Sequence, residues 1–279
     1  FCPKESYCRW VGTGRAFGHG NKALPFIIAP SQESVHRIAG GYYALEKQFP
    51  FMAIIHRLMG GSAFSQCGGT VISKRWVLTA GHCISKLPHR FLVVFGVISK
   101  EGISYDKYHG PGVSMISDRV IVHPEYSHST NDIGFLYTLI LGNFVNFSDE
   151  IQPISLINYN EVSTSFSDVS AYVIGWGKDT HTSFGTRALK FAILPIITST
   201  ECSRYWQIDE RNICTAPGLG HNACQGDSGG PLVVIMNNRF VQIGIVSFGD
   251  ADCPSRRPGV FTRIAAFLPW MEKVTGLKF

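Results

Sequence analysis

Residues 221–231 read HNACQGDSGGP, and the rest of the chain can be interpreted outward from this stretch. Three glycines surround one serine, Ser228, and a cysteine lies four residues before it. Residues without a Cβ allow turns that are closed to other residues and bring backbone N–H groups close to a ligand. Such a loop can present the serine hydroxyl to a substrate and direct amides at a developing oxyanion. Gly-Asp-Ser-Gly is also an ordinary turn composition, so this stretch alone leaves a structural role open.

Two other stretches supply the partners that a nucleophilic serine needs. Residues 79–83 (TAGHC) place His82 beside a cysteine after an apolar run. Asp132 precedes residues 133–136 (IGFL), a pattern typical of the start of a buried strand. A single histidine or a single aspartate in such a position is usually structural. With Ser228 they form a base, an orienting carboxylate and a nucleophile in the chain order His, Asp, Ser.

The length and composition limit the possible functions. A chain of 279 residues can bury a sizeable core in one large domain or two modest ones. Its net charge of +5 is spread along the chain without a block of Lys or Arg, so we expect neither a nucleic-acid nor a membrane-surface partner. No apolar run approaches the roughly 18 residues of a transmembrane helix. Eight cysteines without a C-x-x-C pair predict disulfides rather than zinc, and therefore secretion into an extracellular, oxidising compartment.

Short apolar segments separated by turns predict an all-β fold. We expect strands at 51–58, 69–72, 76–79, 91–95, 120–122 and 135–139, then at 169–174, 190–197, 231–236, 240–248 and 259–263. This spacing, without helices in between, is typical of a β-sandwich or a β-barrel, and periodicity does not distinguish the two. Residues 265–275 have apolar positions at helical spacing and predict a closing amphipathic helix.

The order of these motifs resembles that of the chymotrypsin family of serine endopeptidases. The match runs from Ile38 to the C-terminus and includes residues 38–41 (IAGG), 67–69 (CGG), 247–249 (SFG) and 258–260 (PGV). The resemblance implies two six-stranded antiparallel β-barrels with a C-terminal helix and an active site between the barrels. It implies a leader at residues 1–37 and a protease domain at 38–279, with barrels at roughly 38–150 and 151–279.

The resemblance also implies a pairing of the cysteines. In it, Cys67 pairs with Cys83, Cys202 with Cys214, and Cys224 with Cys253; Cys2 and Cys8 remain and are expected to pair with each other in the leader. Many family members carry one further bridge behind the nucleophile. Its two positions here match Ala171 and Val234, a matched apolar replacement.

By the same resemblance, each site residue receives a role. Ser228 is the nucleophile, His82 is the general base and then the general acid, and Asp132 fixes the histidine tautomer. The backbone N–H groups of Gly226 and Ser228 form the oxyanion hole. Ser247 supports Asp132 by a hydrogen bond, and its segment 247–249 pairs with the substrate backbone as an added strand. No cofactor and no metal are expected, and residues 97–109, which match a calcium loop of some relatives, begin with an apolar residue.

In this family the residue six positions before the nucleophile lies at the floor of the primary specificity pocket, and the resemblance makes that residue Asn222. Trypsin-like members have an aspartate there, whereas Asn222 offers no charge to a buried cation. Gly249 and Gly259 leave the walls open, so we expect a preference for aromatic and large apolar residues. Phe248 replaces the tryptophan of many relatives beside the substrate. As an alternative, Asp250 and Asp252 near the pocket rim could attract a basic residue.

Activation is expected to require cleavage of the Arg37–Ile38 bond. This bond resembles the activation bond of the family, and the resemblance implies that the new ammonium group of Ile38 pairs with Asp227, since a carboxylate is costly to bury without a cation. A neutral pocket would not accept Arg37, so an upstream trypsin-like protease would make this cut; protein inhibitors are further possible partners. No expected disulfide ties the leader to the protease domain, so the leader would be released.

Two other classes of function compete with this interpretation. A catalytically silent homologue could act as a binding or cofactor protein in a proteolytic cascade. Such homologues typically lose the serine, the histidine or the aspartate of the triad, whereas Ser228, His82 and Asp132 are all present here. A disulfide-rich structural or lectin-like β-domain would explain the cysteines and strands, and would leave the three motifs as a coincidence.

Overall fold

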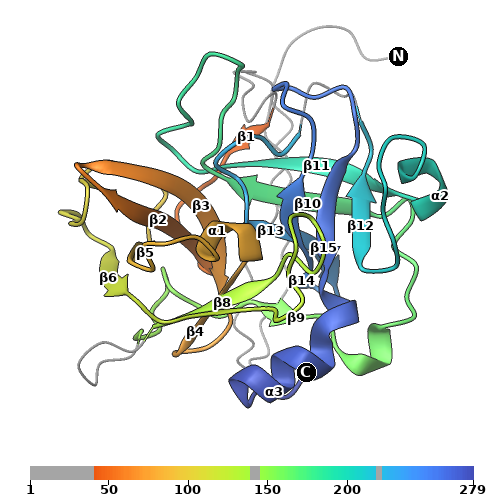
Figure 1. Ribbon diagram of the computed structural model, residues 1–279, viewed down its shortest axis with the longest axis horizontal. Coiled ribbons are helices and arrows are strands. Elements are labelled where there is room, and N and C mark those ends of the chain that lie inside the picture. The colour runs from red at the N-terminus through yellow and green to blue at the C-terminus, as the bar shows by residue number, and fades with distance from the viewer. Residues whose placement is uncertain (1–40, 139–144, 218–221) are drawn as a thin grey trace, which may run out of the picture. The chain divides into compact units, whose positions relative to one another are not determined.

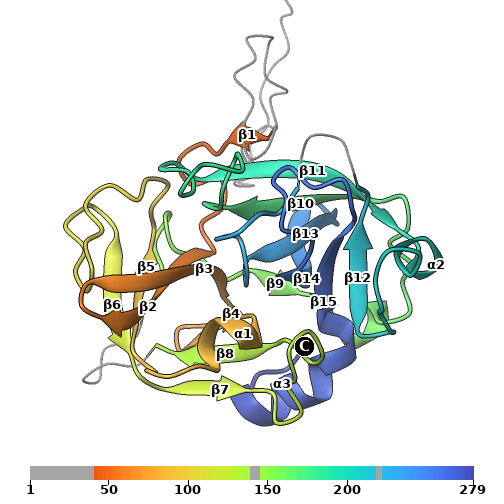
Figure 2. The same cartoon turned by 45° about the horizontal axis from the view of Figure 1, so that its top comes forward.

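The structure is a computed structural model that describes residues 41–138, 145–217 and 222–279. All of these residues belong to one compact unit, Val35–Phe279. Their strands form two antiparallel β-barrels, one from each half of the chain, and both are visible side by side in Figures 1 and 2. The expected fold of two barrels with a C-terminal helix is confirmed.

The first barrel is a seven-stranded sheet in the order β6-β5-β2-β3-β4-β8-β7. Its strands are β2 (Met52–Gly60), β3 (Ala63–Val71), β4 (Trp76–Thr79), β5 (Phe91–Phe95), β6 (Val113–Ser117), β7 (Val120–Val122) and β8 (Gly134–Tyr137). Only Asp118 and Arg119 separate β6 from β7, which are the two edges of this sheet. The chain therefore joins the edges, and β6 and β7 act as one bent strand of a six-stranded barrel.

The second barrel is closed by hydrogen bonds between its ends. Its strands are β10 (Ser170–Gly175), β11 (Lys190–Ile197), β12 (Asn212–Thr215), β13 (Pro231–Met236), β14 (Arg239–Phe248) and β15 (Gly259–Arg263). They run in the order β11-β10-β13-β14-β15-β12, and β11 also pairs with β12, which completes the circle. Two short strands are attached outside it: β1 (Tyr42–Tyr43) is antiparallel to β11, and β9 (Ser155–Leu156) is parallel to β14.

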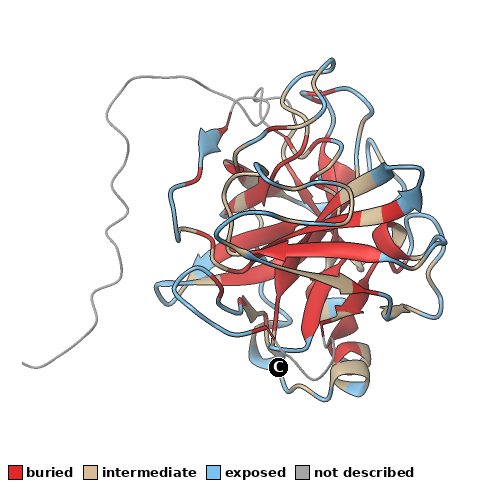
Figure 3. Ribbon diagram, turned by 90° about the vertical axis from the view of Figure 1, so that its left-hand side faces the viewer, coloured by how far each residue is buried: buried red, intermediate tan, exposed pale blue. Residues whose placement is uncertain are grey.

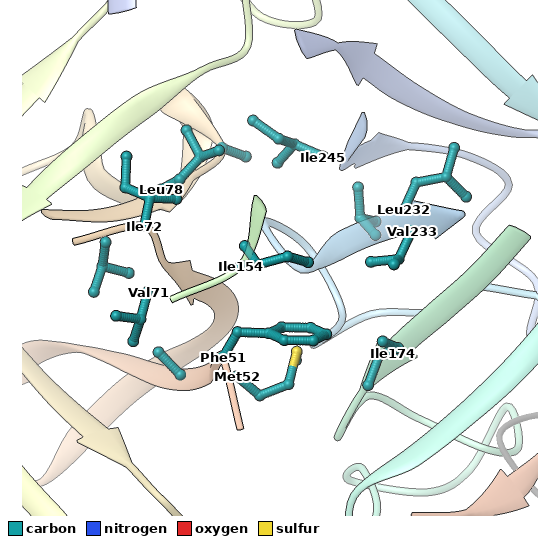
Figure 4. Close-up of a cluster of buried hydrophobic side chains, with 14 of the residues drawn as sticks. Phe51, Met52, Val71, Ile72, Leu78, Ile154, Ile174, Leu232, Val233 and Ile245 are labelled. Carbon is teal, nitrogen blue, oxygen red and sulfur yellow. The ribbon is translucent and has the colours of Figure 1, made fainter. Parts of the chain in front are cut away.

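The cores of the two barrels meet, and Figure 3 shows buried residues concentrated in the strands while the connecting loops are exposed. In Figure 4, Phe51 and Val71 from the first barrel lie opposite Leu232 and Ile174 from the second, with Ile154 between them. These side chains are all at most 6% exposed, so the interface between the barrels is as well buried as their interiors. The buried polar pair between the barrels, Thr70 and Gln242, is satisfied by a hydrogen bond of 2.8 Å from the Thr70 hydroxyl to the Gln242 Oε1.

The helices are few and short. They are α1 (Gly81–Ile84), η1 (Tyr159–Glu161), α2 (Ser199–Cys202), η2 (Ile264–Phe267) and α3 (Leu268–Thr275). The expected helix at 265–275 is therefore divided into a 3-10 turn followed by α3. Pro269 explains this division, because proline fits the first turn of a helix but would clash with the carbonyl four residues earlier in a longer one.

α3 follows the last strand of the second barrel but lies against the first, beside β7 and β8 in Figures 1 and 2. The Trp270 ring stacks on Phe135 of β8 at a centroid distance of 5.3 Å. The Trp76 indole N–H donates to the carbonyl of Thr275 at 3.3 Å. The C-terminal helix thus joins the two barrels. Among the described residues, no helix has the length and apolar character needed to cross a membrane.

Three of the four expected disulfides lie within the described residues, and all three are present. They join Cys67 to Cys83, Cys202 to Cys214 and Cys224 to Cys253. The expected pair Cys2–Cys8 lies outside the described residues, as do the activation residues Arg37 and Ile38. Ala171 and Val234 are both fully buried on the adjacent strands β10 and β13, which is consistent with the apolar replacement of a bridge.

Candidate active site

His82 and Asp132, fifty residues apart in the chain, are joined by two hydrogen bonds. His82 lies on α1, directly after β4, and Asp132 lies just before β8, the neighbour of β4 in the sheet. The backbone N–H of His82 donates to Asp132 Oδ1 at 2.8 Å, and its ring Nδ1 lies 2.7 Å from Asp132 Oδ2. A carboxylate only accepts, so Nδ1 carries the proton and Nε2 keeps its lone pair. Asp132 is 1% exposed, whereas the His82 side chain remains 29% accessible.

The second barrel holds Asp132 in place, although Asp132 belongs to the first. Ser247 of β14 donates its hydroxyl to Asp132 Oδ2 at 2.6 Å. Thr262 of β15 donates its hydroxyl to the carbonyl of Asp132 at 2.8 Å. The His82–Asp132 pair therefore lies at the junction of the two barrels, where α1 is seen in Figure 2. Each oxygen of the carboxylate has at least one donor, and its position is defined by both barrels.

The loop that carries Ser228 is fixed against the segment that leads into α1. The backbone N–H of Gly68 donates to the carbonyl of Ser228 at 2.8 Å, and the Thr79 hydroxyl donates to the carbonyl of Gly68 at 2.8 Å. Gly229 has a φ of +78°, and a Cβ there would lie 2.6 Å from the carbonyl of Gly68 and would also overlap the Thr79 hydroxyl. A glycine is therefore required at this contact. The Ser228 loop lies beside residues 79–80, next to His82, and the Ser228 side chain is half-buried.

Asp227 is a buried carboxylate directly beside the nucleophile. It is 1% exposed, and its two oxygens accept from the backbone N–H groups of Gly177 at 2.7 Å and of Cys224 at 3.0 Å. A Cβ on Gly175 or Gly177 would overlap this carboxylate, so the two glycines make the space for it. Burial raises the pKa of Asp227 from 3.8 to about 6. Within the part of the chain that the structure describes, Asp227 forms no ion pair.

Asn222, Gly249 and Gly259, the residues expected to form the primary pocket, lie close together. Asn222 is 1% exposed; its side-chain N–H donates to the carbonyl of Arg257 at 3.1 Å, and its Oδ1 accepts from the Ala223 N–H at 2.9 Å. A Cβ on Gly259 would lie 2.9 Å from Asn222 Oδ1. A Cβ on Gly249 would meet only the Gly259 Cα, at 4.0 Å. The floor is therefore neutral and the space beside Gly249 is open.

A cationic residue that the sequence analysis did not place there, Arg257, lies next to Asn222 through its backbone carbonyl. Arg257 lies 3.9 Å from the carboxylate of Asp250, and its guanidinium lies 5.5 Å from the ring centre of Trp206. Phe248 meets Trp206 edge-to-face at 5.7 Å. Asp250 thus has a nearby counter-charge, while Asp252 is exposed.

Several residues that support the site were not identified from the sequence. Thr262 and Arg257 carry no motif, because their partners lie far away in the chain, and Thr79 stands in the stretch 79–83 but was given no role of its own. Gly175 and Gly177 do have a detectable signal, since they flank Trp176 as Gly-Trp-Gly at the end of a strand. The described residues contain one cluster with the spacing of metal ligands, Cys67, His82 and Cys83, and its two sulfurs are bonded to each other.

Comparisons with known proteins show the family to which the chain belongs. The family model described as Trypsin matches residues 38–271. The chain is 31% identical to chymotrypsin-like elastase family member 1 of Macaca fascicularis, over 92% of this chain and 94% of that protein. It is 32% identical to a collagenase of Hypoderma lineatum, over 96% of each. A solved structure titled HL collagenase superposes with a TM-score of 0.74 at 30% identity and covers 86% of this chain and 99% of that one. The chain therefore belongs to the chymotrypsin family of serine endopeptidases.

Proposed function

We propose that this endopeptidase cleaves peptide bonds with His82, Asp132 and Ser228 as its catalytic triad. The observation that carries this proposal is the double hydrogen bond between His82 and Asp132, with the Ser247 hydroxyl on the same carboxylate. A pair oriented in this way leaves Nε2 of the ring as a base beside the Ser228 loop. A merely structural histidine would not need its tautomer fixed by a carboxylate that both barrels hold in place.

The proposed reaction has two stages. The Ser228 hydroxyl attacks the carbonyl carbon of the scissile bond while His82 Nε2 takes its proton. The backbone N–H groups of Gly226 and Ser228 stabilise the resulting oxyanion, and loss of one such donor typically lowers the rate about 100-fold or more. His82 then protonates the leaving amine, and an acyl-enzyme remains. Water attacks the acyl-enzyme with His82 again as the base, and Asp132 stays ionised throughout.

We infer a preference for aromatic and large apolar residues before the cleaved bond. The neutral amide of Asn222 at the floor supports this, because a buried lysine or arginine side chain there would lack a counter-charge. Arg257 supports it further, since it neutralises Asp250 at the rim and disfavours a second cation. Among the described residues the Asn222 amide donates one hydrogen bond, to the carbonyl of Arg257, and its second hydrogen would suit the hydroxyl of a tyrosine.

We further propose that the chain is secreted as a zymogen with a leader at residues 1–37 and a protease domain at 38–279, whose barrels span roughly 38–150 and 151–279. The carboxylate of Asp227 supports this, because its burial raises its pKa and a buried carboxylate is stabilised by a paired cation. Cleavage after Arg37 by a trypsin-like protease would supply the ammonium group of Ile38. Pairing of the two charges would then order the oxyanion loop.

The test is a cleavage profile on a peptide pool, with chain cut after Arg37 and a Ser228→Ala variant treated identically. Cleavage after Phe, Tyr, Leu or Met, absent from the variant, would support both the triad and the neutral pocket. Cleavage after Arg or Lys would retain the triad and refute the pocket assignment. No cleavage and no labelling of Ser228 by an organophosphonate would instead identify a catalytically silent homologue that acts as a binding protein.

A further inference from the structure

The side chain of Gln66 connects the first barrel to the loop that carries the nucleophile. Gln66 lies on β3, and its Nε2 is 3.3 Å from the carbonyl oxygen of Gly226 and 3.3 Å from that of Trp176. Its Oε1 accepts from the ammonium group of Lys100 at 3.0 Å. Both hydrogens of the amide group thus have an acceptor, and the oxygen has a charged donor.

Lys100 and the two carbonyls together determine which way this amide points. An ammonium group donates and never accepts, so only the oxygen of Gln66 can face it. The NH₂ group must then face the two carbonyls, which accept and never donate. A hydrogen bond to a charged donor is stronger than one between neutral groups. The orientation of Gln66 is therefore fixed from both sides, by the ammonium group of Lys100 at its oxygen and by the two carbonyls at its NH₂ group.

Lys100 is itself held in place by the second barrel. Its backbone N–H donates to the carbonyl of Arg187 at 2.8 Å, and the neighbouring residue Ser99 forms a β-bridge with Ala188. The Trp176 indole N–H donates to the carbonyl of Ile98 at 3.0 Å. The segment that bears the ammonium group is thereby fixed beside Trp176, which directly follows β10. The carbonyl of Trp176 is one of the two that Gln66 binds.

Gly226 is the residue whose freedom this arrangement limits. Its φ is +96°, a conformation that glycine adopts readily and leaves readily. A Cβ on Gly226 would lie 3.2 Å from Gln66 Nε2 and 3.2 Å from the Cα of Gly177, so the residue is closely packed between them. A hydrogen bond to its carbonyl fixes the peptide plane on one side of Gly226. The N–H on the other side is the proposed oxyanion donor.

We propose that Gln66 is a positioning residue for catalysis, which acts through the carbonyl of Gly226 to direct the Gly226 N–H at the oxyanion, and that Lys100 orients the Gln66 amide. This inference rests on the function proposed above. Gln66 does not touch the substrate carbonyl, so its loss should affect the transition state and leave substrate binding nearly unchanged.

The experiment uses the chain cut after Arg37 and compares Gln66→Met with Gln152→Met. Methionine keeps the length of the side chain and removes its donors. Gln152 is a matched control, because its Nε2 donates to the carbonyl of Ser148 at 2.6 Å on an exposed loop. We expect kcat of Gln66→Met to fall about tenfold, less than for direct loss of an oxyanion donor, with KM within about twofold. Gln152→Met should match the wild type.

Two further variants test the role of the amide orientation. Gln66→Glu keeps the contact with Lys100 but turns an oxygen toward the carbonyls of Gly226 and Trp176, so we expect a larger fall in kcat than for Gln66→Met. Lys100→Met leaves the amide in place and removes only its orienting donor, so kcat should fall less than for Gln66→Met. If Gln66→Met proves unstable, the Lys100→Met variant alone tests the inference. An unchanged kcat of Lys100→Met would then refute the role of Lys100 in orienting the Gln66 amide.

Binding of two inhibitors separates positioning from general damage. A peptide boronate forms a tetrahedral adduct on Ser228 with an oxygen in the oxyanion hole, whereas a cleaved product peptide binds without one. Gln66→Met should weaken the boronate about as much as it lowers kcat and should leave the product peptide unaffected. Equal weakening of both ligands, or a kcat within twofold of wild type, would overturn the inference. A wild-type cut chain that is inactive and not labelled would instead refute the proposed function itself.

Discussion

Replacement of Asp227 by asparagine in the uncut chain should make its stability less sensitive to pH. Burial raises the pKa of Asp227 from 3.8 to about 6 in the folded chain. Because the folded-state pKa is the higher one, the folded state holds the proton more tightly than the unfolded state. The favourable contribution of this carboxyl is therefore complete below pH 3.8 and is lost as the pH rises through about 6.

The size of the effect follows from the same two values. At about 1.4 kcal/mol for each pH unit, the difference amounts to about 3 kcal/mol between the protonated and ionised limits. About 2 kcal/mol of this should be lost between roughly pH 4.5 and 7.5. The substituted asparagine would not ionise, so the variant should lack this part of the pH dependence. Asparagine also presents a donor to the Cys224 N–H, but this loss is equal at both pH values and cancels in the comparison.

Urea unfolding of the uncut Ser228→Ala chain, with and without Asp227→Asn, measures this difference directly. Tryptophan fluorescence at the two pH values, with the disulfides intact, gives four free energies of unfolding. The same measurement after the cut at Arg37 is a control, because the proposed pairing with Ile38 should lower the pKa of Asp227 and reverse the trend. If the free energy of unfolding depended equally on pH in both uncut chains, the pKa of Asp227 would not be raised by folding. The physical basis of the proposed switch would then fail.

Three further predictions concern other parts of the structure. Ser247→Ala removes a 2.6 Å hydrogen bond to Asp132, so kcat/KM for a peptide ester should fall about tenfold. An unaltered kcat/KM would contradict a supporting role for Ser247. Gly229→Ala places a Cβ against Thr79 at a positive φ and should lower the melting temperature and abolish phosphonate labelling; a stable, labelled variant would contradict the account of this loop. Millimolar calcium should not change the melting temperature, because residues 97–109 begin with Val97, and a clear upward shift would reveal a calcium site there.

Much of the fold could be predicted from the sequence, because long apolar strands carry a strong local signal. The ranges 76–79, 91–95, 190–197 and 231–236 agree with the observed strands at both ends. Two strands of the barrels, β6 and β12, were not predicted, for different reasons. β6 is only partly buried and mixes serine with apolar residues, whereas β12 contains Asn212 and is short. Both depend on pairing with distant strands more than on their own composition.

The choice of barrels over a sandwich came from the resemblance and not from the pattern of strands. Closure depends on the β11–β12 pairing and on the two-residue step from β6 to β7, and neither has a sequence signature. The same limit applies to the candidate site. The motifs around His82 and Ser228 are local and could be recognised, whereas the contacts of Gln66 and Arg257 join residues that only the fold brings together.

The position of α3 has a consequence for the synthesis of this protein. Trp270 covers Phe135 of the first barrel, yet it is synthesised only after the strands of both barrels. The first barrel can pair its strands early, but this apolar face stays open to solvent until α3 has been made. During that interval the nascent chain exposes an apolar surface that a chaperone can bind. Shortening the chain by its last helix would make this transient exposure permanent, so aggregation during expression, more than loss of chemistry, is the expected fate of a truncated product.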